Sequence, residues 1–165
     1  MIAGINAQAS AAACGVAWLA ELDFFSGLLC VTTAPLSMTA TTPTGTHTFT
    51  GLGSFAGVSG LKESADTGRE MLTMSLSIVD TAMLALALGN VEGYRGRAAR
   101  LYLQLFDEAF QPVGSPLPSW AGVMDKVVIN RRSADSGGGS AGGSIDMQCS
   151  RSGLARSFAL WQLAE

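Results

Sequence analysis

The sequence has little charge and little of the chemistry that active sites usually require. Charged residues make up 14% of the 165 residues, and His47 is the single histidine. A lone histidine cannot build a metal site, which takes three or four ligands. His47 also has no cysteine near it and no serine or acid at the spacing of a nucleophile motif. We therefore predict an ordinary surface or interface histidine, no cofactor and no enzymatic activity.

Cysteines are also scarce. Cys14, Cys30 and Cys149 are widely spaced, their number is odd, and no two form a CxxC pair. This pattern argues against both a disulfide framework and a zinc site. We expect these cysteines to be small buried thiols.

Long hydrophobic runs and basic regions are missing as well. Apolar residues reach 48% and mean hydropathy is +0.32, yet no apolar run attains the ~18 to 20 residues that a membrane helix needs. We expect no membrane insertion, and we expect further copies or partner chains to cover the surplus apolar surface. The net charge is -3 and the first basic residue is Lys62, so there is no electrostatic footprint for binding nucleic acid.

The two ends of the sequence differ from its middle. Residues 1–15 are mostly small and apolar, and they contain no Lys or Arg. A secretory signal has a positive start and a Leu-rich run, whereas Asn6, Gln8 and Ser10 interrupt this segment. We interpret residues 1–15 as an N-terminal arm that can lie on a neighbour. Residues 154–165 are amphipathic and are interpreted as a C-terminal tail, either a short helix or a partner contact.

Between these ends, residues 16–153 show the alternation of apolar and polar side chains that is typical of strands, and we interpret them as one β domain. The first two strands are expected to form a hairpin. The last two are expected to pair across a flexible Gly- and Ser-rich tip at residues 133–143. The predicted strands are Val16–Phe24, Leu28–Thr33, residues 46–50, Glu70–Val79, Ala98–Asp107, Trp120–Arg131 and Ser144–Ser150.

The first strand is predicted to be half-buried. Trp18, Ala20, Leu22 and Phe24 share one face, and the acids Glu21 and Asp23 lie on the other. Later in the chain, Pro116 and Pro118 are expected to delay the long strand until Trp120, because proline cannot donate to a strand ladder.

One short helix is predicted inside this domain. Asp80 can cap the Ala- and Leu-rich segment Thr81–Leu88, and Gly89 and Asn90 supply a stop. The fold class is therefore mainly β: an antiparallel β-barrel or sandwich with one short inserted α-helix.

The only basic cluster is Arg95, Arg97 and Arg100, with Glu92 beside it. The nearby acid favours a solvated or intersubunit patch over a phosphate site. No P-loop or GxSxG motif occurs in the chain.

Several short sequence blocks follow one another in a fixed order. They are Trp18–Phe24 with its Ser-Gly turn and return strand, Thr48–Gly53, Val58–Ser64, Leu72–Asp80, Leu84–Leu88, Tyr94–Arg97, Arg100–Tyr102, Phe106–Glu108 and Trp120–Asp125. In this order, over residues 18–32 and 50–131, the chain resembles a family of tail-tip and baseplate hub proteins of long-tailed bacteriophages, also found in gene-transfer agents. The chain departs from the family in the Thr-rich run before Thr48 and in residues 133–143.

The resemblance implies a small β-barrel domain of the phage tail-tube and hub type. Such domains form a ring at the end of the tail, in the virion, after assembly in the bacterial host cytoplasm. The implied partners are further copies of the chain, the tail tube and other tail-tip or baseplate proteins, with DNA only as passing cargo. A chain with one barrel favours a hexamer, although a trimer is possible, because a closed ring repeats one heterologous contact.

Within that interpretation, the expected contacts between subunits are Tyr94, Arg95, Arg97, Arg100 and Trp161. A second interpretation stays open at this point: a β-sandwich that binds a ligand or receptor. Its site would be lined by Trp18, Trp120, Trp161 and Tyr102, although these aromatic residues occupy strand positions that are typical of a core.

Overall fold

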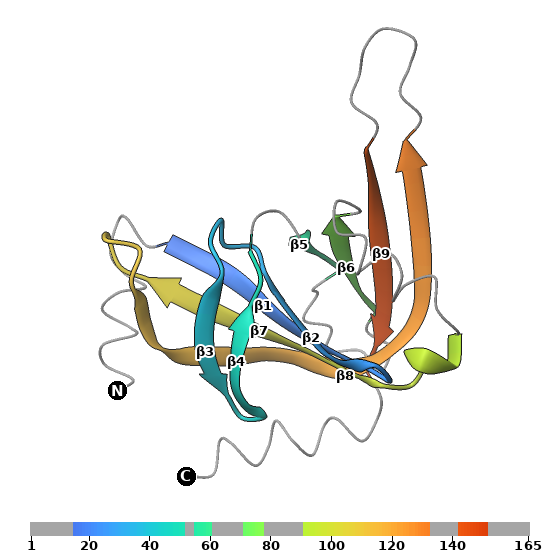
Figure 1. The fold of residues 1–165 in the computed structure, drawn as a ribbon, viewed down its shortest axis with the longest axis horizontal. Coiled ribbons are helices and arrows are strands. Elements are labelled where there is room, and N and C mark those ends of the chain that lie inside the picture. Colours follow the sequence, from blue (N-terminus) through green and yellow to red (C-terminus); the bar gives the residue numbers. More distant parts are fainter. Residues whose placement is uncertain (1–14, 52–54, 61–70, 78–90, 133–141, 152–165) are drawn as a thin grey trace, which may run out of the picture.

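The computed structural model describes residues 15–51, 55–60, 71–77, 91–132 and 142–151, which form antiparallel β-sheet with almost no helix (Figure 1). The mainly β class is thus confirmed. The described strands are β1 (Gly15–Phe24), β2 (Gly27–Thr32), β3 (Met38–Thr42), β4 (Gly45–Phe49), β5 (Phe55–Ser59), β6 (Met71–Ser77), β7 (Ala98–Phe106), β8 (Pro112–Arg132) and β9 (Gly142–Ser150), with one 3-10 turn, η1 (Val91–Gly93). The predicted helix Thr81–Leu88, residues 1–14 of the arm, most of the 133–143 tip and the 154–165 tail lie outside the described residues.

Seven strands form one sheet in the order β2-β1-β7-β8-β9-β6-β5. The long strand β8 joins its two halves: it pairs with β7 up to Val123 and with β9 from Val123 onward. The register of β8 shifts between Met124 and Lys126, and a bulge of this kind bends a strand. In Figure 1, β8 follows β7 and then turns to run beside β9. The predicted pairing of Ser144–Ser150 with Val123–Arg131 is confirmed.

Glycine is required where β8 changes partner. A Cβ atom built on Gly122 would come within 2.5 Å of the Ser150 carbonyl oxygen and would overlap the Trp120 ring. Real Cβ atoms do not approach a backbone oxygen that closely. The absence of a side chain at Gly122 therefore allows β9 to join β8 while Trp120 folds over the junction.

The apolar face of β1 packs between the two half-sheets. Leu22 and Leu101 come from the β1–β7 half, while Leu72, Met74 and Met147 come from the β6–β9 half. The full buried cluster is Ala20, Leu22, Phe24, Val31, Leu72, Met74, Leu76, Tyr94, Ala99, Leu101, Trp120, Met124, Ile145, Met147 and Cys149. The predicted face Trp18, Ala20, Leu22 and Phe24 is confirmed, with Trp18 only partly buried.

The other face of β1 is covered by the hairpin β3–β4, which forms a separate two-stranded sheet. Phe49 and Ala40 of the hairpin pack against Leu19, Cys30 and Tyr102. The prediction that the first strand is half-buried was therefore wrong. Leu19 and Glu21, which point toward the hairpin, are as buried as Leu22 on the opposite face.

The predicted start of the long strand at Trp120 was also wrong, because β8 begins at Pro112. Up to Val123 this strand has a ladder with β7 and none with β9. A strand with one free edge tolerates proline, whose missing N–H can face that edge. The register with β7 also shifts twice here, and the Gln104 amide fills the second shift by donating to the carbonyl oxygens of Leu105 and Val113.

Candidate functional site

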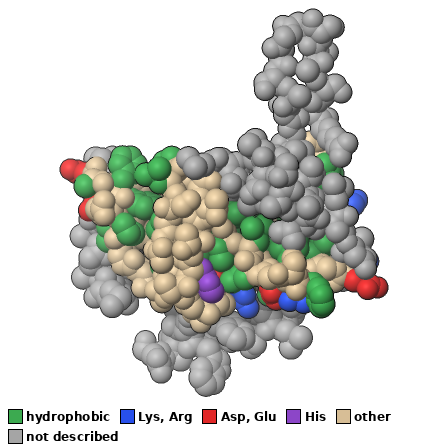
Figure 2. Space-filling view, viewed as in Figure 1, with side chains coloured by type: hydrophobic (Ala, Val, Ile, Leu, Met, Phe, Trp, Pro, Cys, Tyr) green, Lys and Arg blue, Asp and Glu red, His purple; other side chains and the backbone are tan. Residues whose placement is uncertain are grey.

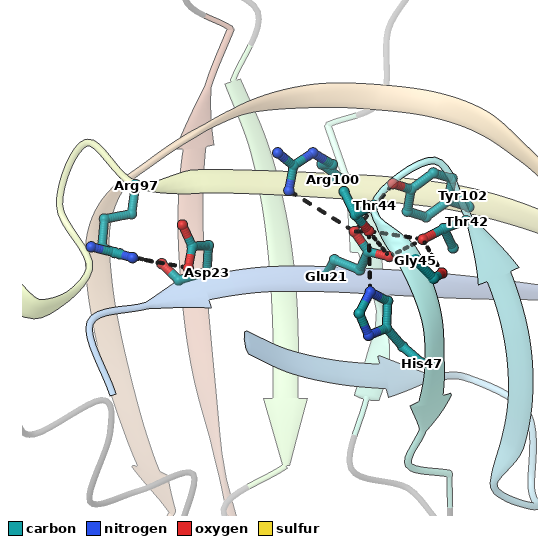
Figure 3. A network of polar contacts seen from close by, with 9 residues as sticks. All are labelled: Glu21, Asp23, Thr42, Thr44, Gly45, His47, Arg97, Arg100 and Tyr102. Atoms are coloured by element: carbon teal, nitrogen blue, oxygen red, sulfur yellow. Dashed lines mark hydrogen bonds and ion pairs between the residues drawn. The ribbon is translucent and has the colours of Figure 1, made fainter. Parts of the chain in front are cut away.

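The most unusual group in the described residues is the carboxylate of Glu21, which is 0% exposed. Strand pairing explains its position. Glu21 lies opposite Cys30 of β2 and opposite Arg100 of β7, and the hairpin β3–β4 covers it (Figure 3). Burial of a carboxylate is costly unless hydrogen bonds replace the lost water. The residues around Glu21 should therefore be donors.

Hydroxyl groups supply those donors. The Thr42 hydroxyl donates to Glu21 Oε1 at 2.6 Å, and the Thr44 hydroxyl lies 2.9 Å from Oε1 and 2.8 Å from Oε2. From the sheet side, the Tyr102 hydroxyl donates to Oε2 at 3.2 Å, and Arg100 Nη1 lies 3.9 Å from the same oxygen. We name these five residues, Glu21, Thr42, Thr44, Arg100 and Tyr102, the Glu21 cluster.

Two groups beside Glu21, namely Tyr102 and Cys30, have raised pKa values. Burial, with the charge of Glu21 and the hydrogen bond to it, raises the pKa of Tyr102 to about 12, against weaker opposing effects of Arg100 and Thr42. Burial, helped by the same carboxylate, raises the pKa of the Cys30 thiol to about 11. Both groups therefore keep their protons to a higher pH than a free tyrosine or cysteine does.

His47 approaches the cluster through one residue. Its Nε2 atom lies 3.3 Å from the Thr44 hydroxyl oxygen, so the order of contacts is imidazole, hydroxyl, carboxylate (Figure 3). In a catalytic triad the acid instead orients the imidazole, which in turn activates the hydroxyl. Here the carboxylate itself accepts from the Thr44 hydroxyl. This geometry joins the hairpin to the sheet and differs from that of a triad.

Of the predicted contact residues, Tyr94, Arg95 and Arg97 lie on the link between η1 and β7, and Arg100 lies in β7. Trp161 lies outside the described residues. Tyr94 is buried in the apolar cluster, so its side chain has little surface to offer in a single chain. Arg97 donates to the Asp23 carbonyl oxygen at 2.8 Å and to its carboxylate at 2.9 Å. Arg95 lies 3.5 Å from Asp125 and remains well exposed. Their proposed role between subunits stays a prediction.

The aromatic residues that would line a ligand site in the second interpretation are mostly buried in the domain where the structure describes them. Tyr102 and Trp120 are buried, and Trp18 packs partly against the apolar cluster. Two predicted thiols, Cys30 and Cys149, are confirmed as free and buried. Cys14 lies outside the described residues.

Large apolar side chains are exposed at the two ends of β1. Val16 and Phe110 lie where β1 begins, with Phe110 in the turn between β7 and β8; we name this pair the Phe110 end. Phe25 and Leu28 lie where β1 turns into β2, and we name them the Phe25 end. Figure 2 shows hydrophobic side chains at the left of the molecule and again at its lower right. Leu36 and Met71 are the other large hydrophobic side chains exposed among the described residues.

Sequence reasoning missed the Glu21 cluster because its members come from three separate segments. Two signals were available. Leu19, on the same face of β1 as Glu21, is apolar. The Thr-rich run that follows supplies donors without charge. Neither signal reveals that the hairpin folds back over β1.

Comparison of the sequence with models of known protein families gave no match, and comparison with curated proteins gave none either. In the described part of the chain, no helix has the length and hydrophobicity needed to cross a membrane. Within the same residues, no three His, Cys, Asp or Glu side chains come together in a way that could hold a metal ion.

Proposed function

We propose that the protein is a structural subunit of a bacteriophage tail tip or baseplate. In this proposal, copies of the chain form a ring in the virion that continues the tail tube and connects it to distal hub proteins. A hexamer is favoured. The proposal starts from the sequence blocks that follow one another in the same order as in tail-tip and hub proteins. Three features of the structure support it.

The observation that carries the proposal is the placement of the exposed apolar side chains. Phe110 is 74% exposed at one end of β1 and Phe25 is 83% exposed at the other. Isolated exposed hydrophobic residues are ordinary. Two pairs at opposite ends of one strand suit a subunit that contacts a neighbour at each end, as every subunit of a ring must.

The bent sheet also supports a barrel of the tail-tube type. The half-sheet β2-β1-β7 faces the half-sheet β9-β6-β5 across the apolar cluster, as opposite walls of a barrel would. In the described residues no ladder joins β2 to β5, and we propose that the barrel is completed outside them or on assembly. A low charge content and a buried polar cluster that serves packing agree with a scaffold.

The test uses a phage that encodes this chain. We expect a nonsense mutation in the gene to give particles without complete tails in a nonsuppressing host, as seen by electron microscopy. The same mutant grown in a suppressor host is the control and should have normal tails. Complete, infectious tails in the nonsuppressing host would overturn the proposal.

A further inference from the structure

We propose that neighbouring copies meet head-to-tail, with Phe110 of one copy packed against Phe25 and Leu28 of the next. This inference rests on the proposed function, because it names the contact through which the subunits would assemble. It is carried by the backbone and exposure of Phe110 and by the position of a second apolar pair at the far end of the same strand.

The turn that carries Phe110 is rigid. Asp107 holds it through its carboxylate, which accepts from the backbone N–H groups of Ala109 at 2.9 Å and Gln111 at 2.8 Å. The Phe110 N–H donates to the Asp107 carbonyl oxygen, and the Asp107 N–H donates to that of Gln111, both at 3.0 Å. These four hydrogen bonds hold the backbone from which the Phe110 side chain projects.

Phe110 is an unfavourable residue for this position on two counts. Its φ of 56° lies in the left-handed region, and it is the one non-glycine residue with positive φ in the described residues. Glycine or asparagine occupies this position of such turns with less strain. The ring is also 74% exposed. Strain of this kind persists where the side chain has a use, and a contact outside the chain supplies one.

The Phe25 end offers a matching surface. Phe25 lies in the β1–β2 turn and Leu28 lies just after it, near the start of β2. The turn is anchored because the Phe25 N–H donates to the Gly93 carbonyl oxygen at 2.8 Å. The two ends are separated by the length of β1, about 30 Å for a ten-residue strand. They therefore cannot contact each other within one chain, whereas two copies can join them.

Such a contact is heterologous, since each copy uses different surfaces toward its two neighbours. After one contact forms, each copy still has one free end, and the contact repeats until the assembly closes. An isologous contact of Phe110 with Phe110 would instead stop at a dimer.

The experiment measures self-association of the purified full chain by sedimentation velocity. We expect Phe110→Gly and Phe25→Ser each to weaken association by roughly tenfold or more, as for central aromatic residues of other interfaces. Leu36→Ser, which removes an exposed hydrophobic side chain that belongs to neither named pair, is the matched control and should associate like the unaltered chain. Phe110→Gly relieves the backbone strain. At protein concentrations where neither protein associates, its melting temperature should therefore not fall below that of the unaltered chain, and loss of association at higher concentration then cannot reflect misfolding.

A mixture of the two variants distinguishes the kinds of contact. Phe110→Gly retains an intact Phe25 end and Phe25→Ser retains an intact Phe110 end, so we expect the mixture to form a heterodimer that grows no further. Absence of this heterodimer, or undiminished association of either variant, would overturn the inference. Tails that assemble normally with Phe110→Gly would overturn it while leaving the proposed function intact. Tails complete without the gene would remove the proposed function whatever the sedimentation result.

Discussion

The two faces of β1 are both buried, yet they are held in different ways. On one face, Leu22 packs among apolar side chains of the opposite half-sheet. On the other, Glu21 holds the hairpin β3–β4 through hydroxyl groups (Figure 3). Apolar packing is non-directional and scales with buried area, whereas the contacts of Glu21 depend on the positions of individual oxygen atoms.

This difference predicts that substitutions on the two faces of β1 affect unfolding in different ways. The half-sheets share one extended core, so damage to the Leu22 face should lower the stability of the whole domain. The hairpin is joined to the sheet by a small apolar cluster, by the Glu21 cluster, and by backbone hydrogen bonds between Thr50 and the edge of β2. Damage to the Glu21 face should therefore release the hairpin before the sheet unfolds.

The largest effect is expected from Leu22→Ala. Leu22 is 0% exposed, and removing a buried leucine side chain loses transfer free energy and leaves a cavity, at a cost of about 2–5 kcal/mol. Denaturant unfolding followed by tryptophan fluorescence measures this change. We expect one cooperative transition at lower denaturant. A change below about 1 kcal/mol would show that the two half-sheets do not share a core.

A smaller and more local effect is expected from Glu21→Ala, the neighbouring position on the opposite face. The variant leaves buried hydroxyls of Thr42 and Tyr102 without their acceptor, at a cost of about 2–3 kcal/mol. Glu21→Gln keeps the shape and one acceptor oxygen, so it should cost about 1 kcal/mol. Amide hydrogen exchange is the decisive measurement. Amides of β3 and β4 should exchange faster, while those of β9 keep their protection. Equal acceleration in all three strands would contradict the view that Glu21 holds only the hairpin.

Alkaline pH should weaken the Glu21 face selectively. The pKa of Tyr102 is raised to about 12 in the folded state, from an ordinary value of 10. The folded state therefore keeps a proton that the unfolded state loses, so the stabilisation is complete below pH 10 and disappears as pH rises from 10 to 12. Cys30, raised from 9 to about 11, acts in the same direction from pH 9 upward. The free energy of unfolding should fall less steeply between pH 8 and pH 12 for Tyr102→Phe than for the unaltered chain. Parallel curves would show that titration of Tyr102 does not cause the loss of stability.

The mildest comparison uses the two buried thiols, one on each face. Cys30 lies under the hairpin and Cys149 lies between the half-sheets. Burial raises the pKa of Cys149 to about 12, with a smaller contribution from Asp125, so both thiols should react slowly with an alkylating reagent at pH 8. In a Cys14→Ser background, Glu21→Ala should speed labelling of Cys30 by about tenfold through local opening and leave Cys149 unchanged. Equal acceleration of both would indicate global unfolding.

Much of the fold follows from the sequence, because strand alternation is a local property. The predicted segments Glu70–Val79 and Ala98–Asp107 correspond closely to β6 and β7. The errors arose where tertiary context decides. Among the described strands, the first part of β8 pairs only with β7, which admits Pro116 and Pro118 on its other edge, and no local pattern shows which edges of a strand are paired. The burial of Glu21 likewise depends on a hairpin that folds back over β1 from later in the chain.

The Phe110 end and the Phe25 end were harder to predict from the sequence than the Glu21 cluster. The sequence directed attention to the arginines at 95–100, and the structure engages Arg97 with Asp23 and Arg95 with Asp125. Phe110 looks like an ordinary turn residue in the sequence. Phe110 is unusual because of its positive φ angle and its exposed ring, and neither property can be seen in the sequence.

We propose that copies of this chain form a closed ring, and native mass spectrometry of the purified protein measures the number of copies. We expect a closed assembly whose mass is six times the 17.0 kDa of the chain, with no larger open series. A stable monomer at every protein concentration tested would contradict the account.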